Sequence, residues 1–280
     1  MIILGLVLAA GIQGLAPGAT VRLKPDNHPM LEIRGEHFDP PVTIKADGST
    51  IGGLRIVESS GIIWLGGAIT GPKGGDARPG KDYGIDVVRS NGVRFDGLMV
   101  TSAVRGMVIA DSQNVSVRNS NFTALRSDGI DAAGSSQLVF ENNKFSNFSP
   151  IKPTGSKKDG NWKDGDHPDA IQLWTTPTNP RMTDIAIRGN VINGDMQGIN
   201  FFGPRGQGYG RVTVANNDLS ILYSAGVSVF ACDECTVTGN VLKAAPEGKY
   251  KVNLRFEDSK GRACGNTIVT IPGHPAAAKC

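Results

Sequence analysis

Aromatic residues, cysteines and long apolar runs are scarce in this sequence, and each shortage excludes a class of protein. Aromatic residues make up 6% of the chain and are not interleaved with basic ones, and the net charge is only +3, so we expect no nucleic-acid partner. Beyond Met1–Leu15, no apolar run approaches the length of a transmembrane helix. No spacing of cysteines and histidines typical of a zinc site is present.

The chain ends differ from the rest in composition. All four cysteines lie in the last fifth of the chain: Cys232, Cys235, Cys264 and Cys280. In an exported protein they permit disulfides that staple the C-terminal end, and otherwise they remain thiols. The apolar segment Met1–Leu15 is either a signal peptide that lacks a basic start, or it contains an amphipathic helix, Leu6–Leu15, that caps the first coil of the sheet.

Glycine is abundant, with 37 residues, and short β-rich segments are separated by Gly, Asn and Asp, a pattern typical of an all-β protein. One eight-residue template recurs, in which apolar residues at the first, third and eighth positions enclose a small residue or asparagine. It fits Ile62–Ile69, Val93–Val100, Val115–Phe122, Leu138–Phe145, Ile185–Ile192, Val212–Leu219 and Cys235–Leu242.

One column of this repeat is nearly pure asparagine: Asn143, Asn190, Asn217, Asn240 and Asn266. Most of these residues are 23 to 27 positions apart, and such a period with inward apolar side chains indicates a β-solenoid. Asparagine suits the turn because it tolerates the left-handed conformation and bonds backbone amides. We expect the amides of successive coils to bond to one another.

A second strand recurs between the templates: Gly84–Val88, Gly106–Ala110, Gly129–Ala133, Ala170–Trp174, Gly198–Phe202, Gly226–Phe230 and Lys251–Arg255. Because strand side chains alternate, the third and fifth residues point outward and form two surface columns. The first column is Asp86, Val108, Asp131, Gln172, Asn200, Ser228 and Asn253. The second is Val88, Ala110, Ala133, Trp174, Phe202, Phe230 and Arg255.

Three loops interrupt the period: Thr70–Tyr83, Ser149–Asp166 and the short, glycine-rich Gly203–Gly210. The turn Thr175–Thr183 adds two prolines. Loops longer than a fold needs usually lie on its binding side. Two of them flank the strand Ala170–Trp174, so we expect them to wall a groove over it. One solenoid domain over residues 17–272 is predicted, preceded by the signal peptide or cap helix (residues 1–16) and followed by a tail (residues 273–280).

The coil templates, the asparagine column and the opening Ala-Pro-Gly…Leu-Lys-Pro resemble the pectin-lyase-like superfamily, from about Leu15 to Ile271. This resemblance implies a single right-handed parallel β-helix. The superfamily holds polysaccharide lyases, polygalacturonase-type hydrolases, mannuronan C5-epimerases, pectin esterases and phage tailspikes. It therefore implies carbohydrate chemistry without fixing the reaction.

Two local similarities are narrower. The segment Asp166–Asp169 has the residue types of the Asp-Pro-His-Asp/Glu motif of alginate epimerases and related lyases, in a different order. The segments Ser127–Asp131 and Pro168–Ile171 resemble polygalacturonase elements. That hydrolase pattern is incomplete, because Pro168 replaces one aspartate, Gln197 stands where a histidine would be, and an Arg-Ile-Lys motif is absent.

Candidate catalytic residues fall on adjacent coils of one face: Arg105, Asp128, Asp131, His167 and Asp169. Removing the C5 proton of a uronate needs a base, a group that stabilises the developing charge, and an acid for the leaving oxygen. Histidine changes charge near neutral pH, so His167 is the candidate base. Arg105 is the candidate clamp for the substrate carboxylate, and Asp128 or Asp169 would orient the imidazole.

These residues also have structural explanations without catalysis. The aspartates cap turns, the histidine is solvated, and Arg105 forms a surface ion pair with Asp128 that adds little stability. Candidate substrate-binding residues are Gln172, Asn200, Trp174, Phe202, Phe230 and Arg255. The three aromatic residues form an outward stripe suited to sugar faces, unless they pack beneath a loop. Asp164 and Asp166, with the neighbouring aspartates, are candidate oxygen ligands for Ca²⁺; the other expectation is a site without a cofactor.

Three functions follow from these patterns. The first is β-elimination or C5 epimerisation of an acidic, uronate-containing polysaccharide. The second is a glycoside hydrolase that uses aspartates as acid and base. The third is a non-catalytic polysaccharide-binding or tailspike-like solenoid. In each case we expect a polysaccharide partner and a secreted, periplasmic or cell-surface location, while the oligomeric state stays open.

Overall fold

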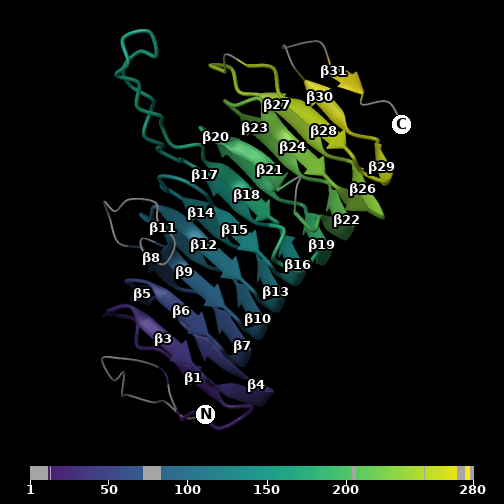
Figure 1. The fold of residues 1–280 in the computed structure, drawn as a ribbon. Coiled ribbons are helices and arrows are strands. Elements are labelled where there is room, and N and C mark those ends of the chain that lie inside the picture. Colours follow the sequence, from purple (N-terminus) through teal and green to yellow (C-terminus); the bar gives the residue numbers. More distant parts are fainter. Residues whose placement is uncertain are drawn as a thin grey trace.

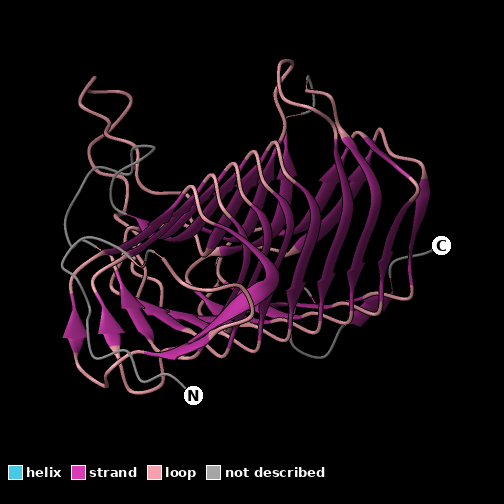
Figure 2. Ribbon diagram, turned by 90° about the horizontal axis from the view of Figure 1, so that it is seen from below, coloured by secondary structure: helices cyan, strands magenta, loops and turns pink. Residues whose placement is uncertain are grey.

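The computed structural model describes residues 12, 14–71, 83–203, 206–248, 250–269 and 275–277. Within these ranges the chain forms strands and no helix, and the strands stack into three long sheets around one core (Figures 1 and 2). Neighbouring strands are parallel except for one antiparallel pair at the C-terminal end. The predicted parallel β-solenoid is therefore confirmed. The signal peptide or cap helix expected before residue 17 falls mostly outside the described residues.

Each sheet takes one strand from nearly every coil, in spatial order. Sheet A contains β1 (Thr20–Arg22), β4 (His37–Lys45), β7 (Ser60–Leu65), β10 (Asn91–Asp96), β13 (Gln113–Arg118), β16 (Ser136–Glu141), β19 (Met182–Arg188), β22 (Tyr209–Ala215), β26 (Cys235–Thr238) and β29 (Gly261–Cys264), with β25 (Cys232–Asp233) beside β22. Sheet B contains β2 (Asn27–His28), β5 (Thr50–Ile51), β8 (Ala68–Thr70), β11 (Met99–Thr101), β14 (Asn121–Thr123), β17 (Lys144–Ser146), β20 (Val191–Gly194), β23 (Asp218–Ile221), β27 (Val241–Ala244), β30 (Thr267–Val269) and β31 (Pro275–Ala277). Sheet C contains β3 (Leu31–Arg34), β6 (Leu54–Val57), β9 (Tyr83–Val88), β12 (Arg105–Ala110), β15 (Ile130–Ala133), β18 (Asp169–Trp174), β21 (Gln197–Phe202), β24 (Ala225–Phe230) and β28 (Asn253–Glu257).

The core is a stack of like side chains, because each inward position repeats on the next coil. Phe122 and Phe145 lie in register on sheet B, with ring centroids 5.0 Å apart and ring planes at 13°. This close stacking explains the glycine that opens most strands of sheet C. A Cβ atom on Gly129 would lie 2.5 Å from the carbonyl oxygen of Ala170 and 2.7 Å from the Phe145 ring, so no larger residue fits there.

The predicted asparagine ladder is confirmed. All five residues are buried, and each of the first four donates from its backbone N–H and its amide to the next side chain. In Asn190, the backbone nitrogen and Nδ2 each lie 2.9 Å from Oδ1 of Asn217, and Nδ2 also donates to the carbonyl of Phe140 at 3.0 Å. The side chains thereby satisfy turn groups that would otherwise be buried without partners.

The predicted register of sheet C is confirmed over the central coils, where Asp131 pairs with Val108 and Gln172. The prediction that the first column is a surface stripe is wrong, because Asp86, Asp131, Asn200 and Ser228 are all buried. The register expected for the last strand is wrong by two residues. A bulge in β24 between Ala225 and Val227 shifts the pairing, so Arg255 lies opposite Ser228 rather than Phe230. Such an irregularity changes which residues face each other, and the sequence repeat does not reveal it.

Candidate functional site

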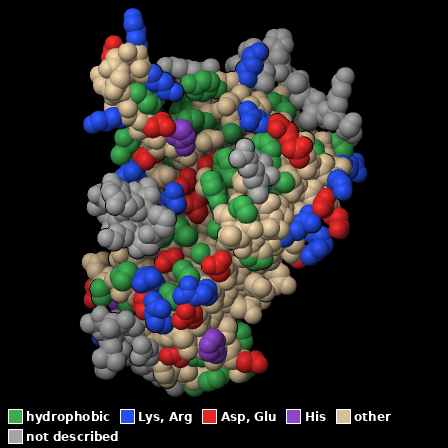
Figure 3. Space-filling model, in the orientation of Figure 1, with side chains coloured by type: hydrophobic (Ala, Val, Ile, Leu, Met, Phe, Trp, Pro, Cys, Tyr) green, Lys and Arg blue, Asp and Glu red, His purple; other side chains and the backbone are tan. Residues whose placement is uncertain are grey.

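Sheet C is the floor of the candidate site. The segment Asn147–Pro168, between β17 and β18, lies at the N-terminal ends of its strands, and the segment Thr175–Arg181 lies at the C-terminal end of β18. A pocket of about 330 Å³ opens at the N-terminal side, and it is lined by Arg105, Ser127, Asp128, Asp164, Gly165, Asp166, His167 and Gln172. Figure 3 shows acidic and basic side chains gathered over β12 and β15, beside hydrophobic ones. Of the predicted loops, Thr70–Tyr83 lies largely outside the described residues.

Three buried aspartates and one arginine form the centre of the site. In Asp128, Asp131 and Asp169, 3%, 8% and 1% of the residue is exposed, respectively. Arg105 lies between two of them, with Nε 3.0 Å from Oδ2 of Asp128 and Nη1 2.9 Å from Oδ2 of Asp131. Its guanidinium also lies 5.9 Å from the ring centroid of Tyr83, one coil earlier. The ion pair predicted at the surface is therefore a largely buried cluster.

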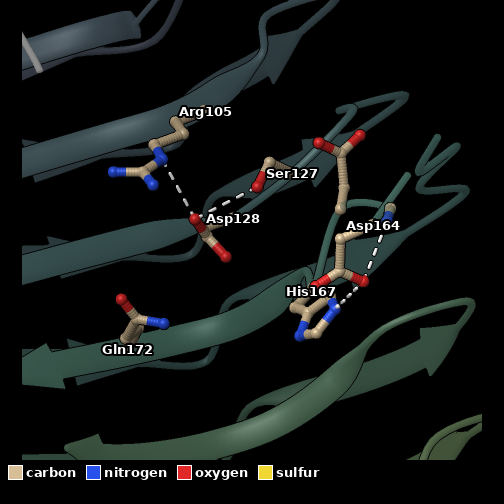
Figure 4. Close-up of a pocket in the computed structure, with 8 residues that line it drawn as sticks. Arg105, Ser127, Asp128, Asp164, His167 and Gln172 are labelled. Atoms are coloured by element: carbon tan, nitrogen blue, oxygen red, sulfur yellow. Dashed lines mark hydrogen bonds and ion pairs between the residues drawn. The ribbon is translucent and has the colours of Figure 1, made fainter. Parts of the chain in front are cut away.

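Hydrogen bonds hold two of these carboxyl groups more firmly than the third. Asp169 accepts from Nε2 of Gln172 at 2.9 Å and from Nδ2 of Asn200, and its own backbone N–H donates to Oδ1 of Asp128 at 2.9 Å. Ser127 lies 3.2 Å from Oδ2 of Asp128 (Figure 4). The oxygens of Asp131 have no hydrogen-bond partner in the described part of the chain, although one is close to Arg105.

Burial raises the pKa of Asp128, and it raises the pKa of Asp131 and of Asp169 well above the usual range of aspartate. The negative charge of Asp128 is the next cause for the other two, and Arg105 opposes the shift in all three. One guanidinium faces three carboxyl groups where water barely reaches them. The cluster therefore keeps protons at pH values at which an exposed aspartate is ionised.

The predicted base lies on the rim of this pocket rather than inside the cluster. The side chain of His167 is 65% exposed, and its Nε2 lies 3.2 Å from Oδ1 of Asp164, which is 67% exposed. Figure 4 shows the two side chains meeting across the pocket from Gln172. Among the described residues, the partner that orients the imidazole is thus Asp164, not Asp128 or Asp169 as we expected.

The aspartates proposed as calcium ligands have other partners. The carboxylate of Asp166 accepts hydrogen bonds from Nε and Nη2 of Arg126 at 2.9 and 3.0 Å and from the backbone N–H of Ile151 at 2.8 Å. Arg105 and the amides of Gln172 and Asn200 occupy oxygens of the buried cluster. In the ranges that the structure describes, no group of three or more His, Cys, Asp or Glu residues is arranged to hold a metal ion. These residues therefore do not fit a calcium site.

The aromatic stripe begins at the C-terminal end of β18. Trp174 is 46% exposed, and its ring centroid lies 6.0 Å from that of Phe202 on β21. Phe202 and Phe230 are half-buried. Asn200, by contrast, is completely buried and bonds Asp169, so it supports a carboxyl group and does not present a surface for a substrate.

Sequence reasoning missed three residues in or next to the site, Tyr83, Arg126 and Ser127, and the contacts of Lys152 in the adjoining loop. Tyr83 occupies the position of Arg105 on the preceding coil. Alignment of the residue that precedes the glycine of each sheet C strand would therefore have revealed it. Lys152 pairs with Asp195 and lies 5.7 Å from the ring centroid of Tyr223, contacts that a repeat alignment does not contain.

Comparison with known proteins identifies the family. Residues 46–253 match the model of a right-handed β-helix region. The chain belongs to this right-handed β-helix family. No curated protein matches the sequence.

Two solved structures share the fold. PfbA, a surface adhesin of Streptococcus pneumoniae, is 11% identical with a TM-score of 0.55; the match covers 96% of this chain and 73% of the adhesin. The periplasmic alginate epimerase AlgG is 12% identical with a TM-score of 0.52; that match covers 89% of this chain and 60% of the epimerase. At such identities the likeness establishes a common fold and no common activity.

Proposed function

We propose that this β-helix protein removes the C5 proton of uronate residues in an acidic polysaccharide, which leads to β-elimination or to C5 epimerisation. The observation that carries the proposal is the composition of the pocket. It places an exposed imidazole, a guanidinium and a buried carboxyl group with a raised pKa around one cavity (Figure 4). These are the three kinds of group that the reaction needs.

His167 acts as the base. Its ring is accessible at the rim, and Asp164 accepts a hydrogen bond from it when it is protonated. This contact orients the ring and stabilises the imidazolium that forms when the C5 proton is taken. An orienting carboxylate on the same loop also keeps the base in place as the substrate enters.

Arg105 and Asp128 act on the substrate from the floor. Arg105 lines the pocket and is a quarter exposed, so its guanidinium can bind the uronate carboxylate and stabilise the charge that develops there. Asp128 also lines the pocket, and burial raises its pKa, so it can hold a proton for the leaving oxygen.

The steps balance as follows. His167 takes the C5 proton, and the electron pair of the C5–H bond moves toward the carboxyl group. In elimination this pair forms the C4=C5 double bond, the C4–O4 bond breaks, and the leaving oxygen receives the proton of Asp128. In epimerisation Asp128 gives its proton to C5 from the face opposite His167, and the C4–O4 bond stays intact.

The acidic floor does not prevent an acidic substrate from binding. Carboxyl groups that retain their protons do not repel a uronate, and they donate hydrogen bonds to it. Arg105 adds positive charge to the floor of the pocket. This balance of charge supports an anionic polymer as the substrate.

A second candidate, glycoside hydrolysis, is favoured by the carboxyl cluster. Asp131 on β15 and Asp169 on β18 lie on neighbouring strands, and Asp128 lies just before β15. Asp169 accepts side-chain hydrogen bonds that Asp131 lacks in the described part of the chain, so the two carboxyl groups have different surroundings, as an acid and a base require. In that reaction His167 would contribute only to binding.

We also propose a location outside the cytoplasm. A disulfide joins Cys232 and Cys235, and disulfides persist mainly in oxidising compartments. Among the described residues, no helix is long and apolar enough to cross a membrane. Labelling of free thiols in protein purified from its natural compartment tests this, since a reduced pair would contradict it.

The experiment is incubation with alginate, polygalacturonate and glucuronate-containing polymers. Ultraviolet absorbance reports the new C4=C5 bond, and a reducing-sugar assay reports chain cleavage. Elimination raises both signals, and epimerisation raises neither but changes the proton spectrum of the polymer. Reducing ends without absorbance would instead establish hydrolysis. No change on any polymer would reject catalysis and leave a binding solenoid.

A further inference from the structure

A braced hairpin projects from the edge of the solenoid beside the candidate site. It comprises residues Ser149–Asp166, and it stands clear of the three sheets in two perpendicular views (Figures 1 and 2). Its two arms are joined by an antiparallel bridge, in which Thr154 and Lys163 exchange backbone hydrogen bonds of 3.0 and 2.8 Å. The solenoid does not need this excursion to connect β17 with β18, because other coils make the same connection in a few residues.

The base of the hairpin is fixed on both sides. Asp166 pairs through both oxygens with Arg126 on the preceding coil, and Lys152 pairs with Asp195 on a following coil. Ile151 and Asp166 bond each other twice, through backbone and side chain, at 2.8 Å. The hairpin is therefore held in its projecting position.

The tip of the hairpin carries one aromatic ring and three lysines. Trp162 is 40% exposed, and Nζ of Lys157 lies 5.5 Å from its ring centroid. Lys158 and Lys163 are exposed, and Ser156 shapes the turn by bonding the side chain of Asn161 at 2.7 Å. An exposed indole stacks on the apolar face of a sugar, and nearby ammonium groups pair with its carboxylates. Figure 3 shows basic side chains at the projecting end, with acidic ones beside them.

We propose that the hairpin tip, defined here as Lys157, Lys158, Trp162 and Lys163, is a second binding surface for the anionic polysaccharide, separate from the pocket. The inference rests on the proposed class of substrate and not on the reaction. Such a surface binds a part of the chain that lies outside the pocket. Its contribution is therefore limited to polymers long enough to reach both surfaces, and it raises their affinity by linking two contacts.

Affinity electrophoresis in gels that contain polygalacturonate or alginate tests this. We expect wild-type protein to be retarded, and we expect Trp162→Ala to weaken retention about threefold to tenfold. The triple variant Lys157→Gln, Lys158→Gln, Lys163→Gln should weaken it about tenfold or more and reduce its dependence on salt. The charge-matched control changes exposed lysines elsewhere, Lys24→Gln, Lys144→Gln and Lys251→Gln, and Tyr250→Ala controls for loss of an exposed ring.

Defined oligosaccharides separate the hairpin from the pocket. With a trimer, the tip variants should bind and react as the wild type does, whereas with the polymer their apparent KM should rise and kcat should stay unchanged.

If no polymer is turned over but the tip variants still lose retention, the catalytic proposal fails and this one stands. Three results would overturn it: no retention of the wild type, equal loss in the control variants, or loss of trimer binding. Vesicles containing phosphatidylglycerol provide a further arm, because tip-dependent binding to them with unchanged polymer retention would assign the tip to a membrane surface.

Discussion

Replacement of Arg105 should make the stability of the protein depend on pH in a defined direction. The variant Arg105→Gln removes the cation that lies 3.0 and 2.9 Å from the carboxylates of Asp128 and Asp131. Breaking a buried ion pair by removing one partner typically costs 3–5 kcal/mol. The arginine side chain is 25% exposed, so we expect the low end, about 3 kcal/mol, at pH 8.

The sign follows from the pKa shifts. Burial raises the pKa of Asp128, Asp131 and Asp169 in the folded protein, and loss of Arg105 raises them further. The folded state then binds more protons than the unfolded state above the ordinary aspartate pKa, so stability falls as pH rises through this range. At pH 4 these carboxyl groups are protonated in the folded variant, and the difference from the wild type should shrink to about 1 kcal/mol or less.

Urea unfolding at unit steps from pH 4 to pH 8 measures the effect, with the slope m checked against the wild type at each pH. Arg94→Gln is the matched control. Arg94 is 53% exposed and pairs with the half-buried Asp96 at 3.3 Å, so its removal should cost under about 1 kcal/mol. A destabilisation of Arg105→Gln that is the same at pH 4 and pH 8 would refute the assignment of raised pKa values to this cluster.

Three further predictions concern the base, the ladder and the stripe. His167→Ala should abolish turnover without lowering Tm, because the side chain is 65% exposed; substantial activity in this variant would remove the histidine from the mechanism. Asn190→Ala should lower the free energy of unfolding in urea by about 3 kcal/mol, because the buried N–H of Asn143 and the buried carbonyl of Phe140 lose this partner. The control Asn121→Ala, at an exposed asparagine, should cost little. Trp174→Ala should weaken oligosaccharide binding by calorimetry while Tm stays within about 2 °C, and a large fall in Tm would indicate a packing role instead.

The sequence was sufficient to predict the solenoid because its fold repeats. Each coil presents the same inward positions, so five asparagines in register revealed a ladder that the hydrogen bonds confirm. The same logic aligned Arg105, Asp128 and Asp169 on consecutive coils. It fails where the period breaks, as at the bulge in β24, where Arg255 lies two residues from its expected partner.

The burial of side chains and the contacts made by loops could not be predicted from the sequence. Outward alternation predicted that Asp131 and Asn200 would be exposed to a substrate, yet both are buried beside Arg105 and Asp169, respectively. The pairing of Asp166 with Arg126 joins residues forty positions apart through a loop that follows no repeat. The sequence repeat therefore predicted where the cluster lies. The burial that raises the pKa of its carboxyl groups could be seen only in the three-dimensional structure.

Deuterium incorporation at C5 tests the central claim most directly, because elimination and epimerisation both begin with loss of that proton. A uronate polymer is incubated with the protein in D₂O, and the C5 proton signal is followed by nuclear magnetic resonance. We predict that the signal decays with the wild type, by exchange or by elimination, and persists with His167→Ala. Release of reducing ends while the C5 proton is retained would contradict the proposal and assign the site to hydrolysis.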